Sequence, residues 1–147
     1  MDEKAGTDRK GEESTPLKLI LTKNVYDFLN SVKPKGKEEE RCGLLVGKKE
    51  ENFFADEIFE IKNVKASVSE FELDPAESLK VFEYAERKEK EVIGVWHTHP
   101  FWKAYPSAKD LAGMKLFPGV WVIVSRDEMR AFVLEDDINE IEIVVKF

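Results

Sequence analysis

One segment constrains the fold of this chain more than any other, because an apolar run leads directly into a closely spaced pair of histidines. Val92–Trp96 has the composition of a buried strand. His97 and His99, the only two histidines of the chain, follow it at once. Side chains alternate along an extended chain, so both imidazoles lie on one side. Pro100 ends regular pairing. The sequence therefore predicts a strand that delivers two imidazoles to one place at its end.

A carboxylate completes a possible set of metal ligands. Asp110 follows in the pattern H-x-H-x7-S-x2-D, in which the serine is Ser107. Two imidazoles and one carboxylate are three ligands, the number that a catalytic zinc site uses when its fourth position stays open for water. A closed structural site more often has four protein ligands that include cysteines, and this chain has one cysteine. The pattern indicates a hydrolytic metal site formed by His97, His99 and Asp110.

Ser107 and Asp110 also have a purely structural interpretation. Pro106-Ser107-Ala108-Lys109-Asp110 is typical of a helix start, with Ser107 as N-cap and Asp110 at the third helical position. The two interpretations are compatible, because a helix start fixes where the carboxylate points. The Ser107 hydroxyl either caps the helix or donates a hydrogen bond to an oxyanion. It is not expected to be a nucleophile, since no third histidine remains to serve as its base. Without a metal, the two histidines would be partly exposed loop residues.

A metal site that hydrolyses amides also needs a general base. Glu38-Glu39-Glu40 is a charge run, and Glu38 and Glu39 are expected to be solvated. Glu40 differs because it directly precedes the buried strand expected at Cys42–Val46. Its position at the entry to the sheet lets it face a cleft. Glu40 is therefore the candidate base.

The remaining pattern predicts a mixed α/β fold with a central sheet and two substantial helices. The further strands are expected at Leu17–Leu21, Phe53–Ile61, Gly119–Ser125, Met129–Leu134 and Ile138–Val145. One helix begins after Thr22 and stops before Pro34. The other begins at Asp74-Pro75 and runs to about Lys90, with Leu79, Phe82 and Ala85 as its apolar stripe.

Length and composition favour one domain without membrane segments. The 147 residues suffice for a single core. Residues 1–16 are polar and predict a flexible tail, which leaves residues 17–147 as the domain. No apolar run approaches the roughly 18 residues that cross a bilayer, and the N-terminus lacks the apolar stretch of a signal peptide. A lone Cys42 fits a reducing, intracellular setting, so a cytoplasmic location is expected.

The charge balance argues against a nucleic-acid binder. There are 23 Lys and Arg against 30 Asp and Glu, a net charge of −7. Such a balance provides no basic surface with which to displace counterions from nucleic acid. Charged residues make up 36% of the chain, a trend of proteins from thermophiles that a charge-rich mesophilic protein would share.

Three segments together resemble one known family. They are Glu40-Arg41-Cys42-Gly43-Leu44-Leu45-Val46-Gly47, Gly94-Val95-Trp96-His97-Thr98-His99-Pro100 and Ser107-Ala108-Lys109-Asp110. They are similar to the motifs of the JAMM (MPN+, JAB-type) metalloproteases. Asn63 before a loop and Phe71-Glu72-Leu73-Asp74-Pro75 leading into a helix extend the resemblance, which covers about residues 17–147.

The resemblance implies a fold and a role for each site residue. The fold would be the MPN (JAB-like, cytidine-deaminase-like) domain, a central mixed sheet flanked by helices. His97, His99 and Asp110 would bind one Zn²⁺ per chain. Glu40 would accept the proton of the attacking water and pass it to the leaving amine, and Ser107 would stabilise the oxyanion. Cys42 would be a packing residue.

The resemblance also implies a substrate class. The family hydrolyses isopeptide or peptide bonds after the C-terminal glycine of ubiquitin-like proteins, and this chain resembles its stand-alone prokaryotic and archaeal, deubiquitinase-like members. The expected partner is an archaeal modifier or ubiquitin-fold sulfur carrier and its conjugates, acted on by a monomer or homodimer. An extended substrate tail could add to a sheet edge near the cleft. The loop Phe101–Tyr105 either borders the cleft, contacts substrate or covers the core.

Two alternatives belong to other functional classes. One is a non-catalytic MPN scaffold that binds partners without metal. Family members of that kind usually lack the ligands, whereas this chain has all three. The other is a nucleic-acid-associated protein with a similar H-x-H-P motif, which the acidic balance disfavours.

Overall fold

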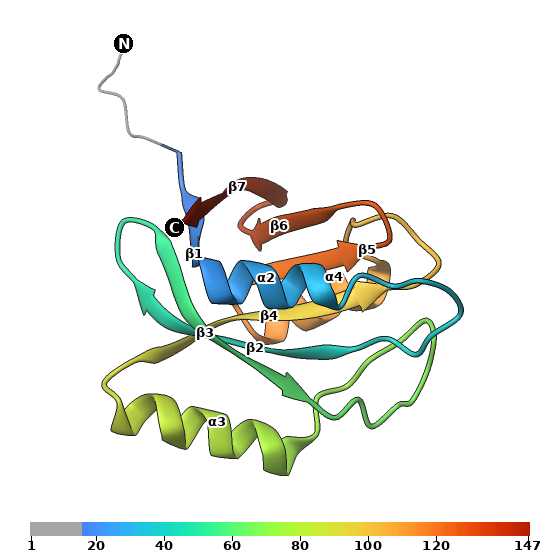
Figure 1. Ribbon diagram of the computed structural model, residues 1–147, viewed down its shortest axis with the longest axis horizontal. Coiled ribbons are helices and arrows are strands. Elements are labelled where there is room, and N and C mark those ends of the chain that lie inside the picture. Colours follow the sequence, from blue (N-terminus) through green and yellow to red (C-terminus); the bar gives the residue numbers. More distant parts are fainter. Residues whose placement is uncertain (1–15) are drawn as a thin grey trace.

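The structure is a computed structural model that describes residues 16–147, so the tail expected at residues 1–16 lies outside the described residues except for Pro16. The described part contains seven strands and three helices (Figure 1). In chain order these are β1 (Lys18–Thr22), α2 (Lys23–Ser31), β2 (Cys42–Lys49), β3 (Phe53–Ile61), α3 (Pro75–Arg87), β4 (Glu91–His99), α4 (Ala108–Leu116), β5 (Val120–Ser125), β6 (Met129–Leu134) and β7 (Ile138–Lys146).

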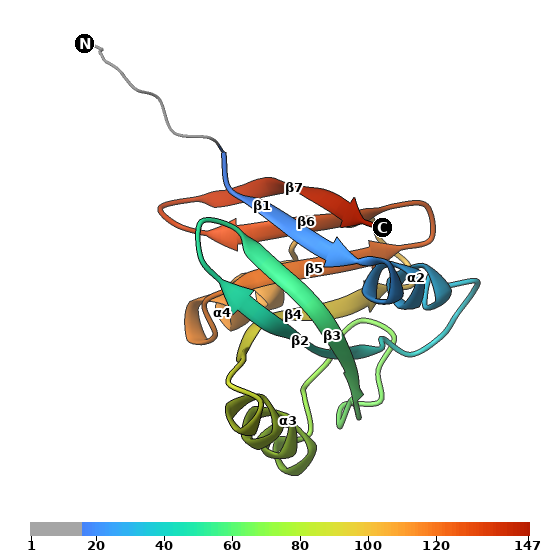
Figure 2. The ribbon, with the colours of Figure 1, turned by 60° about the vertical axis from the view of Figure 1, so that its left-hand side comes forward.

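The strands form one mixed sheet that closes on itself in the order β1-β3-β2-β4-β5-β6-β7. β1 pairs in parallel with both β3 and β7, and this double pairing closes the ring (Figure 2). β4 and β5 are also parallel, whereas β2 pairs antiparallel with both β3 and β4. The predicted mixed α/β architecture is confirmed, but its closure is not visible in any local pattern of the sequence.

Closure limits where a substrate strand can add to the sheet. β2 pairs with β4 between Glu91 and His97, and β5 pairs with β4 between Gly94 and His99. Both edges of the strand that carries the histidines are therefore occupied. An extended substrate tail therefore cannot add to β4, and its addition to another sheet edge near the cleft stays a prediction.

All seven expected strands are present, and the helices differ from expectation in two respects. α3 begins as predicted, with Pro75 in the first turn and the Asp74 carboxylate accepting a hydrogen bond from the Glu77 amide at 2.9 Å. Its buried residues are Val81 and Ala85, while Leu79 and Phe82 are 59% and 43% exposed. The face toward the sheet is rotated by about one residue from the predicted stripe. The second difference is α4: the sequence predicted its start at Ser107 but only two substantial helices, whereas the structure has a third.

The core has two parts, to which β5 contributes alternate side chains, as does β4 from Val95 onward. One part packs with α2 and includes Leu29, Trp96 and Val122. The other lies toward α3 and α4 and includes Val95 and Ile123. Because side chains alternate along a strand, His97 and His99 share the face of Val95. The histidines therefore point to the side on which α3 and α4 pack.

Gly43 is required where β2 passes Trp96. A Cβ atom at this position would lie 1.9 Å from the Phe59 carbonyl oxygen and 2.5 Å from the Trp96 Nε1. That indole nitrogen donates a hydrogen bond of 3.1 Å to the same carbonyl. Any side chain at Gly43 would displace this bond and separate β2 from its neighbours.

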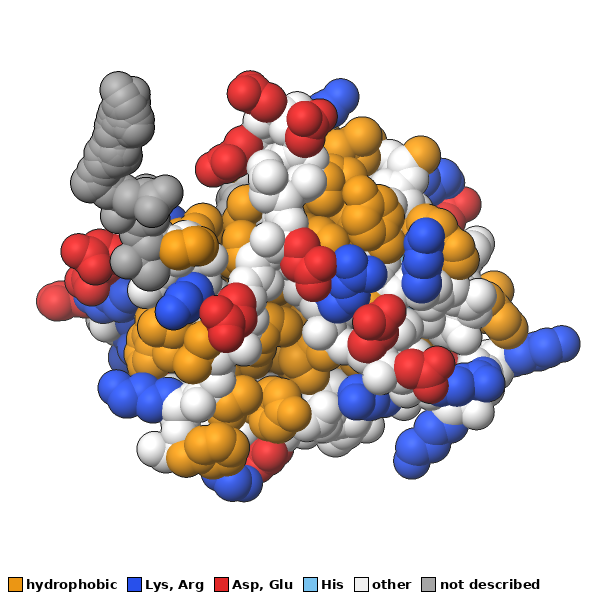
Figure 3. Space-filling model, turned by 90° about the horizontal axis from the view of Figure 1, so that it is seen from above, with side chains coloured by type: hydrophobic (Ala, Val, Ile, Leu, Met, Phe, Trp, Pro, Cys, Tyr) orange, Lys and Arg blue, Asp and Glu red, His pale blue; other side chains and the backbone are white. Residues whose placement is uncertain are grey.

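The surface carries mixed charges. On the face shown in Figure 3, acidic and basic side chains lie among apolar ones, and no histidine is visible. Arg41 pairs with Glu60 and Arg130 with Glu140, each through two hydrogen bonds. Exposed pairs of this kind contribute about 0–1 kcal/mol each to stability. They do not test the expectation that the protein comes from a thermophile, which stays a prediction. Within residues 16–147 we find no helix with the length and apolarity of a membrane span.

Replacing Leu45 by alanine tests the packing of the core. Leu45 is 0% exposed, so its truncation should lower the free energy of unfolding by about 2–5 kcal/mol through lost burial and a residual cavity. Urea unfolding followed by circular dichroism measures this loss. Leu116 is 87% exposed, and Leu116→Ala should change stability by less than about 0.5 kcal/mol. Equal effects of the two substitutions would contradict the described core.

Candidate metal centre

Two histidines and one aspartate from distant parts of the chain converge at a buried point. The Nε2 atoms of His97 and His99 are 3.1 Å apart, and each lies 3.1 Å from Oδ2 of Asp110. Among the described residues these three form the cluster with the composition and spacing of a metal site. Their side chains are 0%, 4% and 5% exposed. The structure thus brings together the three residues that the sequence singled out as ligands.

Asp110 reaches this point because it sits in the first turn of α4. The Ser107 hydroxyl accepts a hydrogen bond from the Asp110 amide at 3.1 Å, and Asp110 Oδ2 accepts one from the Ser107 amide at 2.9 Å. This is a complete capping box. The capping interpretation of the sequence is confirmed, and it directs the carboxylate toward the histidines as expected.

The two imidazole rings are held in different ways. His99 Nδ1 lies 2.8 Å from the Lys103 carbonyl oxygen, so Nδ1–H donates there and leaves the Nε2 lone pair facing the cluster. His97 Nδ1 is buried and has no hydrogen-bond partner. Its ring is instead stacked on Phe71, with centroids 4.4 Å apart and an interplanar angle of 25°. Trp121 contacts the same ring edge-on at 5.9 Å.

The electrostatics of the cluster favour a bound cation. Burial alone would raise the pKa of Asp110, but hydrogen bonds with His97 and His99 and from the Ser107 amide hold it well below its usual value. Burial lowers the pKa of His97. At His99, burial acts in the same direction but is outweighed by the Asp110 carboxylate and the Lys103 carbonyl, which raise its pKa. An ionised carboxylate facing imidazole nitrogens is a donor set that a metal ion or protons must satisfy.

The spacing of the three atoms also fits a small ion. Ligand atoms around an ion held tetrahedrally at about 2.0–2.1 Å are about 3.3 Å apart, close to the 3.1 Å separations found here. Cys42 does not take part. Its side chain is 0% exposed, its thiol donates to the Ile61 carbonyl at 3.5 Å, and burial raises its pKa to about 12. These properties fit the packing role expected for Cys42.

Glu40 lies beside the cluster. It borders a cleft of about 230 Å³ together with His99 and Ser107. The neighbouring Arg41 is tied to β4 between the two histidines, because its amide donates to Thr98 Oγ1 and its carbonyl accepts from the Thr98 amide, both at 2.9 Å. The structure therefore places the candidate base at the candidate metal site, as the sequence predicted.

The Glu40 carboxyl group is buried, and one of its oxygens lacks a hydrogen-bond partner. Its side chain is 5% exposed, and Oε1 has no hydrogen-bond partner. Burial raises its pKa to about 8, with the negative charges of Asp110 and Glu70 adding to the rise and His99 opposing it. A carboxylate that is buried, unpaired and next to a cleft is typical of a catalytic acid or base.

The loop between the ligands divides its side chains between cleft and core. Phe101 and Trp102 are 54% and 49% exposed and border the cleft, with the Trp102 ring 5.7 Å from that of His99. Ala104 is buried in the core. Of the interpretations left open for Phe101–Tyr105, lining the cleft and covering the core each apply to part of the loop.

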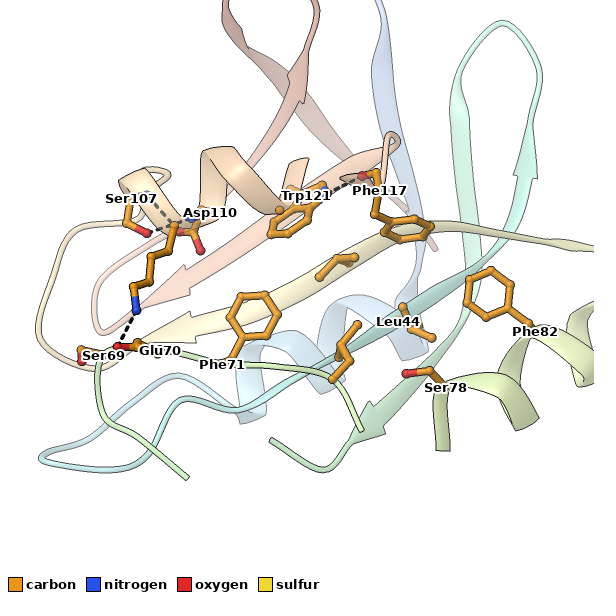
Figure 4. A pocket seen from close by; sticks show the side chains of 14 residues that line it. Leu44, Ser69, Glu70, Phe71, Ser78, Phe82, Ser107, Asp110, Phe117 and Trp121 are labelled. Carbon is orange, nitrogen blue, oxygen red and sulfur yellow. Dashed lines mark hydrogen bonds and ion pairs between the residues drawn. The ribbon is translucent and has the colours of Figure 1, made fainter. Parts of the chain in front are cut away.

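A second, apolar cavity of about 260 Å³ adjoins the cleft (Figure 4). The two share Ser69 and Ser107. Aromatic rings of Phe71, Phe117 and Trp121 line its wall. No sequence pattern predicts that these aromatic residues form a cavity together, since they come from separate segments. The one available signal was the resemblance of the segment that begins at Phe71.

The fold and the cluster define a class of protein: a domain with a closed mixed sheet and, at the end of one strand, a His-His-Asp cluster with the composition and spacing of a metal site. The chain belongs to the JAB-domain family, because the family model described as prokaryotic homologs of the JAB domain matches residues 23–135. The resemblance noted in the sequence is thereby confirmed for most of the chain.

Similar proteins agree with this assignment. The chain is 44% identical over 110 residues to the desampylase of Pyrococcus furiosus, covering 73% of this chain and 76% of that protein. It is 29% identical over 108 residues to a probable TtuB-protein conjugate cleaving protease of Thermus thermophilus, covering 73% and 69%. A solution structure from Desulfitobacterium hafniense superposes with a TM-score of 0.74 at 25% identity, covering 87% of this chain and 92% of the other.

Replacing Glu40 by glutamine should stabilise the metal-free protein in a pH-dependent manner. Below pH 4.5 both states hold the proton, and above about pH 8 both have lost it. Between these values the unfolded chain releases the proton while the folded protein retains it, so wild-type stability falls as pH rises. The gain from Glu40→Gln should therefore grow from pH 4.5 to about 8, reaching at most about 5 kcal/mol.

Chemical denaturation of chelator-treated protein from pH 4 to pH 9 measures this difference. Exposed Glu39 offers the matched control, and Glu39→Gln should give only a small difference throughout. A Glu40→Gln difference that stays flat across the range would refute the buried, uncompensated carboxyl.

Proposed function

We propose that the protein is a zinc-dependent isopeptidase or peptidase that hydrolyses the bond after the C-terminal glycine of ubiquitin-like modifier proteins. The observation that carries this proposal is Glu40, a buried carboxyl with an unpartnered Oε1 that borders the same cleft as His99, which converges with His97 and Asp110. Membership of the JAB-domain family supports it. The names of two relatives, a desampylase and a TtuB-protein conjugate cleaving protease, support the substrate class.

His97, His99 and Asp110 would hold one zinc ion per chain. Two imidazole nitrogens and one carboxylate oxygen are ligands that zinc accepts, and three protein ligands leave a position open. When bound, zinc would polarise the scissile carbonyl and increase the acidity of the attacking water. The Lys103 carbonyl fixes which nitrogen of His99 is available, through the bond of 2.8 Å to Nδ1.

Glu40 would act as the general base and then as the general acid. Its carboxylate accepts a proton as water oxygen bonds to the carbonyl carbon of the glycine. It then returns that proton to the amine nitrogen as the carbon–nitrogen bond breaks. The products are a modifier with a free C-terminal carboxylate and the released amine. With no hydrogen bond at Oε1, the carboxylate has the freedom to reach both partners.

Ser107 would stabilise the oxyanion of the tetrahedral intermediate. Its oxygen accepts from the Asp110 amide, a bond that does not use the hydroxyl hydrogen. That hydrogen remains available to donate into the cleft that Ser107 borders. Ser107 therefore combines both roles that the sequence left open, because capping uses its oxygen and oxyanion binding uses its proton.

The biological setting of the proposal follows from the sequence. The substrate would be an archaeal-type modifier or sulfur carrier joined to another protein, processed in the cytoplasm by a monomer or homodimer. Neither nucleic acid nor membrane is part of the proposal.

Cleavage of a purified modifier–lysine conjugate tests this function. Glu40→Gln should lower kcat by about 10²–10⁴-fold, because proton transfer to and from the reacting groups is lost. A strong chelator should abolish wild-type activity, and stoichiometric zinc should restore it. Glu39→Gln, one residue away on the exposed surface, should cleave at the wild-type rate. Activity that survives Glu40→Gln or chelation would overturn the mechanism.

A further inference from the structure

We infer that the segment of residues 63–73, which leads from β3 toward α3, is a positioning loop for the site: Asn63 fixes the backbone of Glu40, and Phe71 fixes the ring of His97. The inference rests on the proposed function, because it assigns these two residues to the base and to one ligand of that site. Neither residue contacts the reacting atoms in the proposed mechanism, so both are positioning residues.

The loop is closed at its base. Asn63 and Leu73 form an antiparallel bridge. The Val64 amide donates to the Glu72 carbonyl at 3.0 Å, and the Asp74 amide donates to the Lys62 carbonyl at 3.0 Å. These contacts bring the two ends of the segment together, so the residues between them are held as a unit rather than as a free connection.

The Asn63 side chain uses its full hydrogen-bonding capacity. Nδ2 donates to the carbonyls of Glu40 and Glu70, and Oδ1 accepts from the amides of Lys65 and Glu72, all at 3.0 Å. An asparagine has two donors and two acceptor positions, and here all four are satisfied. One of the four bonds leaves the loop and reaches the residue proposed as the base.

The loop therefore holds both polar backbone groups of Glu40. Its carbonyl accepts from Asn63 Nδ2, and its amide donates to the Ser67 carbonyl at 2.7 Å. The carboxylate, in contrast, has an unpartnered Oε1. No hydrogen bond at Oε1 orients the Glu40 side chain. Its position is then set by the backbone from which it projects, and small displacements of such a group reduce the rate.

Phe71 performs the corresponding task for His97. A metal-binding histidine usually donates its second ring N–H to a carbonyl or carboxylate, which orients the ring. His99 does so through Lys103, whereas Nδ1 of His97 has no partner. The Phe71 ring is stacked on His97 at 4.4 Å and 25°, and Figure 4 shows it projecting from its segment toward β4. Stacking supplies the orientation that a hydrogen bond supplies at His99.

The two halves of the loop predict separable defects. Loss of the Phe71 ring should weaken zinc binding, since His97 would be free to rotate. Loss of the Asn63 donors should slow catalysis and leave zinc binding intact, since Glu40 is not a ligand. General loosening of the fold would instead affect both quantities in both variants.

Zinc affinity, measured by competition with a chromophoric chelator, tests Phe71. Phe71→Ala should bind zinc about 10–100-fold more weakly than wild type. Phe71→Leu, which keeps apolar bulk but has no ring, should fall between the two. Phe82 borders the same apolar cavity, but its ring contacts Phe117 at 6.2 Å, so Phe82→Ala is the matched control and should retain wild-type affinity.

Kinetics on the conjugate substrate test Asn63. Asn63→Asp keeps the two acceptor bonds and removes the donors, and it should lower kcat by about 10–100-fold with KM and zinc affinity unchanged. Asn139 also donates to a carbonyl, that of Asp137, on the exposed surface, so Asn139→Asp is the control and should match wild type. Hydrogen exchange at the Glu40 amide should accelerate in Asn63→Asp while that of Leu45 does not.

The outcomes separate this inference from the proposed function. Wild-type zinc affinity in both Phe71 variants, or wild-type kcat and Glu40 exchange in Asn63→Asp, would overturn the positioning loop while the proposed function stands. A wild-type protein that binds no zinc would overturn the proposed function itself, and this inference with it.

Discussion

Oδ2 of Asp110 lies 3.1 Å from the Nε2 atoms of both histidines, and all three side chains are buried. The lone pairs of two imidazole nitrogens and one carboxylate oxygen repel one another at this distance unless a metal ion or protons lie among them. The surrounding strands and helix hold the three side chains in this arrangement. The parallel pairing of β4 with β5 and the antiparallel pairing with β2 fix the histidines from both sides. The capping box of α4 fixes the aspartate.

The burial of Glu40 opposes the stability of the fold, which supports the catalytic role proposed for this residue. A carboxyl group with a pKa near 8 in the folded protein and 4.5 in the unfolded chain destabilises the fold at neutral pH. A glutamine or an apolar residue would avoid this cost. The backbone hydrogen bonds to Asn63 and Ser67 hold the group in place nevertheless. A residue that lowers the stability of the fold but is held in place by its neighbours is typical of a functional site.

Local patterns in the sequence predicted much of this. The strand before His97, the capping box at Ser107 and the start of α3 at Asp74 are each encoded within a few neighbouring residues. Closure of the sheet depends on β1 pairing with two strands far along the chain, and no short pattern reveals it. Helical spacing predicts Leu79 and Phe82 on the buried stripe of α3, whereas packing against the sheet buries Val81 beside the predicted Ala85. The bonds of Asn63 depend likewise on tertiary contacts.

X-ray absorption spectroscopy at the zinc edge tests most directly whether His97, His99 and Asp110 bind the proposed catalytic zinc ion. Protein loaded with one equivalent of zinc should show a first shell of nitrogen and oxygen only, at about 2.0–2.1 Å, with the outer-shell scattering of two imidazoles. A sulfur scatterer at about 2.3 Å would place zinc at Cys42 and contradict the account. Failure to take up zinc at all would contradict it equally and favour a scaffold without metal.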